Sequence, residues 1–285
     1  MPWIAQLELE SLIKVFMILR LVSTLVLVPA VLVLVIYGSP FFFLIAVGIV
    51  GTACLYEFSL IARAMGASCQ PWFCYPAFWI LLTALSQKLF PAAAVLAIVL
   101  LVAFLAGMWR TGSMKDRVLG LMASMLGVLY LSLLLSTAIS VRFDFGNDLG
   151  VHWLIVLLVV TWVGDTAAFF IGRRCGRHPF APVLSPKKTN EGAIAGLLAG
   201  AAAAVILQRV LFTNLPLIHV IAASLLIGMF GQLGDLAESM LKRAADIKDS
   251  SRFIPGHGGI LDRVDSLLFS FPILYLYLLW LYPSP

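Results

Sequence analysis

The chain has 285 residues, of which 62% are hydrophobic and only 12% are charged, and its formal net charge is +5 at pH 7. The mean hydropathy of +1.04 excludes an ordinary soluble protein, because too little polar surface is available to cover a globule. The sequence contains no nucleic-acid-binding motif, so we expect no nucleic-acid partner. The composition predicts an integral membrane protein.

Apolar stretches recur along the sequence, and a membrane-spanning helix needs roughly 20 such residues. We therefore expect an all-α polytopic integral membrane protein with about nine transmembrane helices. The predicted spans lie near residues 16–37, 40–61, 72–90, 92–109, 117–141, 152–172, 192–212, 216–236 and 264–282.

The basic residues of the short loops predict the orientation, because Lys and Arg accumulate on the cytoplasmic side. With a cytoplasmic N-terminus, the outer loops hold Lys88 and Arg142, whereas basic clusters at 173–188 and 242–263 lie inside. We expect the N-terminus and both clusters to face the cytoplasm.

The first half of the chain contains few candidate catalytic residues. We therefore divide the chain into N-terminal transmembrane helices, 1–150, and a catalytic transmembrane region, 151–285. Glu57 lies near the cytoplasmic end of its predicted span, close to Arg63. We interpret Glu57 as an acid that extends to the membrane surface. A contribution to a lipid-headgroup site is the alternative.

Asp165 lies within the predicted span 152–172. An ionisable residue at membrane depth costs several kcal/mol unless it faces a partner or a water-filled cavity. We therefore expect Asp165 to line a functional cavity. The alternative is a helix-packing acid that is paired with a neighbouring basic residue.

A segment rich in hydroxyls and lysines follows that span. Ser185, Lys187, Lys188 and Thr189 stand just before a predicted helix start, where such groups can bind phosphate oxygens. A loop that is basic only because it faces the cytoplasm would look similar.

Small residues are spaced four apart in the predicted span 192–212. Gly196 and Gly200 lie beside an alanine cluster, which gives the small-xxx-small pattern of closely packed membrane helices. We expect this span to pack tightly against a neighbour.

The most charged part of the chain is residues 231–266. If the apolar run before it continues as a helix, Asp235, Glu238, Ser239 and Lys242 fall at i, i+3, i+4 and i+7. Two acids, a hydroxyl and a base would then share one helix face.

Residues 255–259 read Pro-Gly-His-Gly-Gly and must turn, because proline removes a donor and glycine admits positive φ. Asp262 and Asp265 then begin the next helix, whose N-terminal N–H groups favour anions. Carboxylates on both sides of a basic, glycine-rich turn predict a site for Mg²⁺ and phosphate. The alternative is a solvated, charge-balanced loop.

Residues 239–265 resemble the signature of the bacterial phosphatidate cytidylyltransferase (CDP-diacylglycerol synthase) family. The matching positions are Ser239, Lys242, Arg243, Lys248, Asp249, His257, Gly258, Gly259, Asp262, Arg263 and Asp265. The segments GDTAAFFIGR and SPKKTNEG resemble a second conserved block, although Asn190 stands where members usually carry Trp. The start of the first apolar run resembles the usual opening of bacterial members, so residues 1–19 look like an extension.

The resemblance implies that CTP and phosphatidic acid react to give CDP-diacylglycerol and pyrophosphate, in phospholipid biosynthesis. The lipid phosphate would attack the α-phosphorus of CTP without a covalent enzyme intermediate. The resemblance also implies one or two Mg²⁺ ions, a homodimer, and a site that faces the cytoplasm from the bacterial inner membrane, where the acyl chains stay in the bilayer.

The same resemblance implies residue roles. Asp235 and Asp262 would be the principal metal ligands, with Glu238, Asp249 and Asp265 as further candidates. The residues expected to bind phosphates are Lys187, Lys188, Lys242, Arg243 and Arg263. The hydrogen-bonding and turn residues of the substrate site would be Ser185, Thr189, Ser239, Gly258 and Gly259. Asp165 would line the cavity, and His257 would be the functional histidine.

Two other classes of protein remain open at this point. A cation-coupled transporter also carries acids within helices, although its site should lie near the bilayer midplane between repeated halves. Another CTP-dependent lipid enzyme, such as a polyprenol kinase or a cytidylyltransferase for a different lipid phosphate, would use similar groups.

Overall fold

A computed structural model describes residues 25–212, 214–248, 250–251 and 258–283. The predicted extension at 1–19 and the beginning of the span at 16–37 lie outside the described residues. An apolar helix, Leu25–Tyr37, covers the remainder of that span. Further helices are α2 (Pro40–Ala64), α3 (Pro71–Ser86), α4 (Ala92–Met108), α5 (Met114–Phe143), α6 (Asn147–Cys175), α7 (Asn190–Leu211), α8 (Leu217–Ala244) and α9 (Leu261–Leu281).

These helices confirm the prediction of an all-α polytopic membrane protein. Among the described residues, six helices are long and apolar enough to cross a membrane, and three shorter apolar helices accompany them. The helix bounds follow local chemistry. Ser39 caps α2 by accepting a hydrogen bond from the Phe42 N–H, and Pro40 occupies the first helical position. Ser113 and Asp116 form a capping box at α5.

A short antiparallel hairpin between α6 and α7 was not predicted. Its strands are β1 (Pro179–Ala181) and β2 (Ser185–Thr189). The second strand is the lysine-rich segment, which reads as a loop because it lacks apolar alternation. The hairpin gives this segment a fixed position directly before α7.

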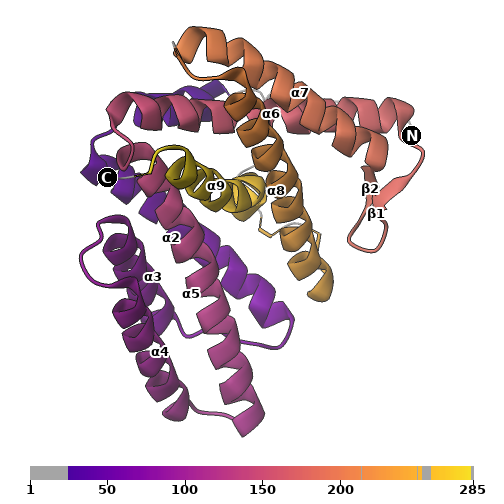
Figure 1. Ribbon diagram of the computed structural model, residues 1–285. Helices are drawn as coiled ribbons and strands as arrows, with labels where there is room; N and C mark the ends of the chain where they lie inside the picture. Colours follow the sequence, from indigo (N-terminus) through magenta and orange to yellow (C-terminus); the bar gives the residue numbers. More distant parts are fainter. Residues whose placement is uncertain (1–24, 213, 249, 252–257, 284–285) are drawn as a thin grey trace.

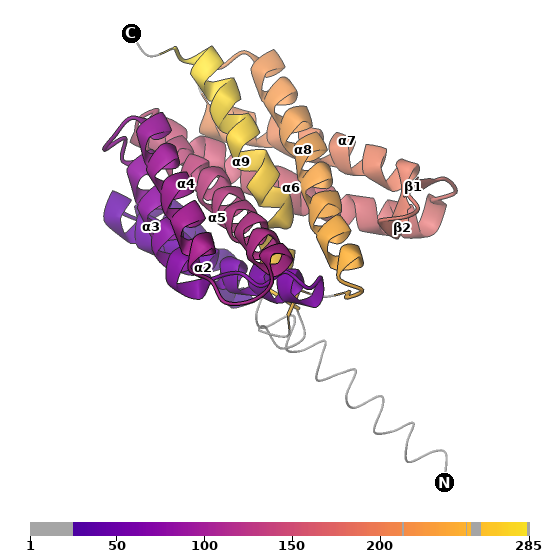
Figure 2. The ribbon, with the colours of Figure 1, turned by 90° about the horizontal axis from the view of Figure 1, so that it is seen from below.

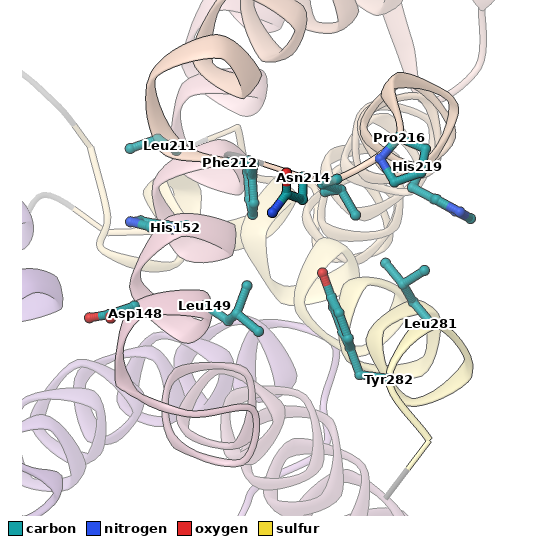
Figure 3. A pocket seen from close by; sticks show the side chains of 11 residues that line it. Asp148, Leu149, His152, Leu211, Phe212, Asn214, Pro216, His219, Leu281 and Tyr282 are labelled. Atoms are coloured by element: carbon teal, nitrogen blue, oxygen red, sulfur yellow. The ribbon is translucent and has the colours of Figure 1, made fainter.

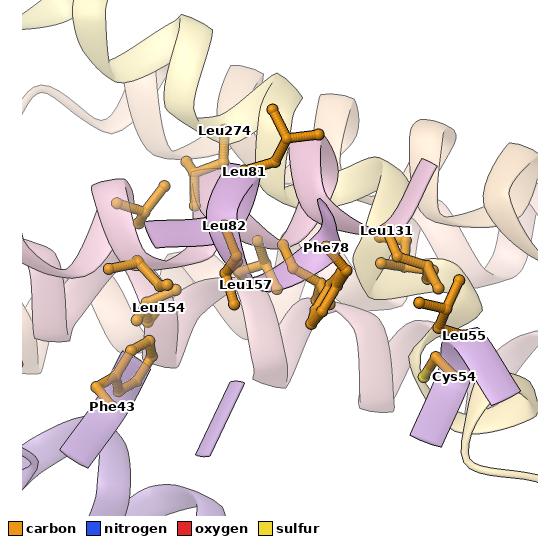
Figure 4. Close-up of a cluster of buried hydrophobic side chains, with 14 of the residues drawn as sticks. Phe43, Cys54, Leu55, Phe78, Leu81, Leu82, Leu131, Leu154, Leu157 and Leu274 are labelled. Atoms are coloured by element: carbon orange, nitrogen blue, oxygen red, sulfur yellow. The ribbon is translucent and has the colours of Figure 1, made fainter. Parts of the chain in front are cut away.

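The helices form two groups that meet along α5 and α9 (Figure 1). One group packs α2, α3 and α4 around α5, and the other contains α6, α7 and α8. Helices α6 and α7 run side by side toward the hairpin, while α8 packs against α9 (Figure 2). The core between the groups contains side chains from both, such as Leu55, Phe78, Leu131 and Leu157 (Figure 4).

The small residues of α7 confirm the predicted close packing. Gly192, Gly196 and Gly200 are all buried. A Cβ atom added to Gly196 would lie 2.9 Å from the Gly164 carbonyl oxygen of α6, and one added to Gly200 would lie 3.1 Å from that of Val160. The two backbones therefore approach closely along several turns.

Arg142 corrects one part of the orientation argument. It was assigned to an outer loop, but it lies in the last turn of α5 and is 4% exposed. Its guanidinium donates hydrogen bonds to the carbonyl oxygens of Val35, at 2.7 Å, and Ile36, at 3.4 Å. Arg142 binds the carbonyl end of helix Leu25–Tyr37, because those carbonyls have no intrahelical donors.

Candidate active site

Lys242 connects the two helices that carry the predicted acids. Helix α8 continues to Ala244, beyond the predicted end at 236. Asp235, Glu238, Ser239 and Lys242 therefore lie on one helix, as their spacing predicted. The Lys242 Nζ lies 2.9 Å from Glu238 Oε2, one turn earlier, and 2.5 Å from Asp262 Oδ1 of α9. The side chains of Lys242 and Asp262 are each 12% exposed, and that of Glu238 is fully buried. One ammonium group therefore joins two carboxylates inside the bundle.

Asp262 is also held by the segment that precedes α9. Its Oδ2 accepts hydrogen bonds from the Ser250 N–H at 3.1 Å, the Ser250 hydroxyl at 2.8 Å and the Gly259 N–H at 2.9 Å. Gly258 has a φ of +79°, which agrees with the predicted turn. Both oxygens of Asp262 thus have donors within the protein.

Asp235 forms a second ion pair, with the hairpin. The Lys188 Nζ lies 2.5 Å from Asp235 Oδ2, and the Ser239 hydroxyl lies 3.5 Å from Asp235 Oδ1. Neighbouring residues of a strand point to opposite faces. Lys188 accordingly reaches the acid of α8, whereas Lys187 is exposed.

Two buried acids lie beside these pairs. Glu238 Oε1 has no hydrogen-bond partner among the described residues, although it is fully buried. Asp265 is 9% exposed, its Oδ1 accepts the Ser266 N–H at 2.6 Å, and it interacts electrostatically with Glu238. Asp165 of α6 lies within electrostatic range of Asp235 and Asp265, and its side chain is exposed in the isolated chain. Three helices thus contribute carboxylates to one region.

Glu57 overturns the interpretation of an acid that extends to the membrane surface. It is 1% exposed and faces the bundle. Its Oε1 accepts hydrogen bonds from the Ser251 hydroxyl at 2.6 Å and the Ile260 N–H at 2.9 Å, and its Oε2 accepts from the Ser250 hydroxyl at 3.0 Å and the Leu261 N–H at 2.7 Å. The proximity of Glu57 to Arg63 in the sequence gave no indication of these partners.

The remaining predicted residues have more varied surroundings. The Arg243 guanidinium donates to the Leu184 and Ile247 carbonyl oxygens at 3.3 and 3.2 Å, which ties the hairpin loop to α8. Thr189 is the N-cap of α7, since its hydroxyl accepts the Gly192 N–H at 3.2 Å. Ser185 is partly buried and follows Leu184, which Arg243 contacts. Arg263 and Asn190 are exposed. Asp249 and His257 lie outside the described residues.

The donor set suits a hard cation in its chemistry. Carboxylate oxygens are the ligands that Mg²⁺ prefers, and the unpartnered Glu238 Oε1 is a buried acceptor that needs a donor or a cation. Within the described ranges, however, no three acidic, His or Cys side chains approach closely enough to hold a metal. The predicted metal ligands Asp235, Asp262, Glu238 and Asp265 therefore stay a prediction, and both carboxylate oxygens of Asp262 are bonded within the protein.

Two cavities lie away from these charges. One, of about 560 Å³, is lined by His152, His219, Asp148 and Tyr282 at the ends of α6, α8 and α9 remote from Asp165 and Asp262 (Figure 3). The other, of about 820 Å³, lies between α3 and α4 and is almost wholly apolar.

Buried carboxylates and lysines thus meet at one end of a bundle of apolar helices, beside a glycine turn. A family model described as the cytidylyltransferase family matches residues 18–281, which is most of the chain. The chain therefore belongs to the cytidylyltransferase family.

Individual relatives agree with this assignment. The phosphatidate cytidylyltransferase of Bacillus subtilis is 43% identical over 129 residues, which are 45% of this chain and 48% of the relative. Those of Staphylococcus saprophyticus and Staphylococcus aureus strain COL are 42% and 40% identical over 130 residues, 46% of this chain and 50% of each relative. The chain spans about half the length of the curated relatives it matches.

Proposed function

We propose that this protein is a phosphatidate cytidylyltransferase that transfers the cytidylyl group of CTP to phosphatidic acid. The observation that carries the proposal is the pair of bridges Lys242–Asp262 and Lys188–Asp235. They place two ammonium groups beside carboxylates from α8 and α9, in a chain of the cytidylyltransferase family. The curated relatives named above carry this activity in their names.

The reaction joins an oxygen of the lipid phosphate to the α-phosphorus of CTP, and the bond from that phosphorus to the β-phosphate oxygen breaks. Pyrophosphate leaves with the bonding electrons. Because the nucleophile is already an anion, the enzyme must mainly reduce charge repulsion and align the two phosphates. Lys188 and Lys242 would donate hydrogen bonds to phosphate oxygens, and both are partly accessible, at 28% and 12% exposed.

A divalent cation forms part of the same proposal. Asp235 and Asp262 would be the principal ligands of Mg²⁺, with Glu238 and Asp265 as further ligands, once the lysines bind substrate phosphates. When bound, the ion supplies positive charge that neutralises phosphate oxygens during the transfer. We also propose a bacterial inner-membrane location with this site at the cytoplasmic face, and a homodimer.

The test uses CTP labelled separately at the α- and γ-phosphates, with phosphatidic acid, Mg²⁺ and protein in detergent. We expect the α-label in lipid and the γ-label in pyrophosphate. Asp235→Asn and Asp262→Asn should each lower this transfer about 100-fold or more, because each removes a proposed ligand of the cation that stabilises transition-state charge.

Asp144→Asn provides the matched control. Asp144 also pairs with a lysine, Lys88, at 3.0 Å, but it lies beyond the far end of α5. This variant should retain transfer. Movement of the γ-label into lipid would instead identify a kinase, and transfer of neither label by folded wild type would contradict a phosphatidate cytidylyltransferase.

A further inference from the structure

The N-cap residue of helix α9 supplies no side-chain cap of its own. Ile260 is at the N-cap position in the αR conformation and makes no side-chain capping hydrogen bond. The Ile260 and Leu261 N–H groups instead donate to Glu57 of α2, at 2.9 and 2.7 Å. The carboxylate therefore caps α9 from another part of the chain, where the helix dipole favours a negative charge.

The Glu57 side chain is completely surrounded by donors. Besides the two N–H groups, the Ser251 hydroxyl donates to it, the Ser250 hydroxyl lies between it and Asp262 with one proton for the two acids, and its exposure is 1%. Burying a carboxylate costs several kcal/mol unless hydrogen bonds replace its water. An apolar side chain could fill the same space without this cost, so the presence of a carboxylate at position 57 requires an explanation.

The Ser250 hydroxyl connects Glu57 to the predicted phosphate site. It lies 3.0 Å from Glu57 Oε2 and 2.8 Å from Asp262 Oδ2. Gly259 fits between the same groups, because a Cβ atom there would lie 2.5 Å from Glu57 Oε2 and would also collide with the Ser250 hydroxyl. The order of contacts is Glu57, Ser250, Asp262 and then Lys242.

We propose that Glu57 is a positioning residue for the cytidylyl transfer. It fixes the start of α9 and the Ser250 hydroxyl, so that Asp262 is oriented toward Lys242. This inference rests on the proposed function. Although Glu57 belongs to the N-terminal half, it organises the charged cluster of the C-terminal half through contacts 193 to 204 residues apart in sequence.

The test compares Glu57→Gln with Ser250→Ala and with the double variant, using the α-label assay. Glutamine keeps the shape of the side chain but turns an NH₂ group toward donors. We expect kcat to fall at least tenfold in each single variant. The double variant should be no less active than Glu57→Gln alone, since Glu57 acts on Asp262 through the Ser250 hydroxyl as well as through the start of α9. Additive losses would overturn this linkage.

Hydrogen–deuterium exchange gives a readout that does not depend on activity. In Glu57→Gln, the Ile260 and Leu261 amides should exchange faster, and in Asp144→Asn they should remain protected even where the melting temperature falls. Unchanged exchange in Glu57→Gln would overturn the capping contact. Faster exchange with an unchanged kcat would overturn the positioning role.

Wild-type protein that shows protected amides but no α-label transfer would overturn the proposed function, and the positioning role with it, while leaving the cap in place. Should Glu57→Gln fail to fold, Ser250→Ala alone decides the matter. It must lower kcat at least tenfold while the Ile260 and Leu261 amides stay protected by Glu57, and full activity would overturn the proposal.

Discussion

Lys242 occupies an unusual place among the charged side chains, because it touches one acid on its own helix and another on α9. Glu238 is fully buried, and its Oε1 already lacks a hydrogen-bond partner within the described part of the chain. Any loss of the ammonium group would leave two carboxylates close together with little solvent. The stability of the protein and the proposed phosphate binding therefore depend on the same side chain.

Lys242→Met should destabilise the protein by about 3 to 5 kcal/mol, the usual cost of leaving a buried charge without its partner. It should also lower the transfer of the α-label. The measurement is unfolding in detergent. Lys187→Met is the matched control, since Lys187 is exposed, and we expect its unfolding free energy to change by less than about 0.5 kcal/mol.

Adding Glu238→Gln to Lys242→Met should recover part of the lost stability, because the buried negative charge is removed together with the positive one. If the Lys242→Met protein were as stable as the wild type, the ion pairs of Lys242 with Glu238 and Asp262 would not contribute to folding.

At the scale of elements, hydropathy predicted where helices are but not how far they extend. Helix α8 runs eight residues past the predicted 236, since Glu238 and Ser239 are buried and Lys242 pairs with Asp262 of α9. The pattern of Asp235, Glu238, Ser239 and Lys242 gave the better prediction there. The β1–β2 hairpin had no signal in the sequence, as its stability comes from contacts such as Arg243 with the Leu184 carbonyl.

Helices α6 and α7 approach closely at a seam formed by Gly164 of α6 and by Gly196 and Gly200 of α7. Gly196→Val should separate the helices, because its Cβ would lie 2.9 Å from the Gly164 carbonyl oxygen, and overpacking of this kind costs about 1 to 3 kcal/mol. The shift would also move Asp165 away from Asp235 and Asp265, so activity should fall more than stability.

The matched control is Leu198→Val, two residues along α7, where the side chain is 63% exposed and faces away from the seam. Its melting temperature and label transfer should match those of the wild type. Equal behaviour of the two variants would contradict a close approach of α6 and α7.

For the whole molecule, the sequence located most of the charged cluster but not its connection to the N-terminal helices. Asp235, Lys188, Lys242, Asp262 and Asp265 could be selected because charge is rare in this chain and their local spacing is regular. Glu57 could not be assigned, since its four donors come from residues 250–261 and no local pattern records a contact over such a sequence separation. The predicted division at residue 150 stays a prediction.

Orientation is testable with the cysteine at the end of α6. Cys175 is exposed, whereas Cys54 and Cys74 are buried. If the charged end faces the cytoplasm, a membrane-impermeant maleimide should label Cys175 in inside-out vesicles and not in intact cells. The Cys175→Ser variant should lose this labelling, which shows that the signal comes from Cys175.

The converse control is Asp148→Cys in the Cys175→Ser background, at the opposite end of the same helix. This cysteine should be labelled in intact cells. The reverse pattern for the two positions would mean that the charged cluster faces away from the cytoplasm, and the proposed access of CTP would then be wrong.

The distance along the chain between Glu57 and its partners also has a consequence for how the protein is made. The Ile260 and Leu261 amides follow Glu57 by 203 and 204 residues. At about 5 to 20 residues per second, a ribosome needs about 10 to 40 s to synthesise that interval. During this time α2 is already complete, but its carboxylate has none of the donors that later surround it. The cap on α9 and the link from Glu57 through Ser250 to Asp262 can therefore form only after α9 has been synthesised.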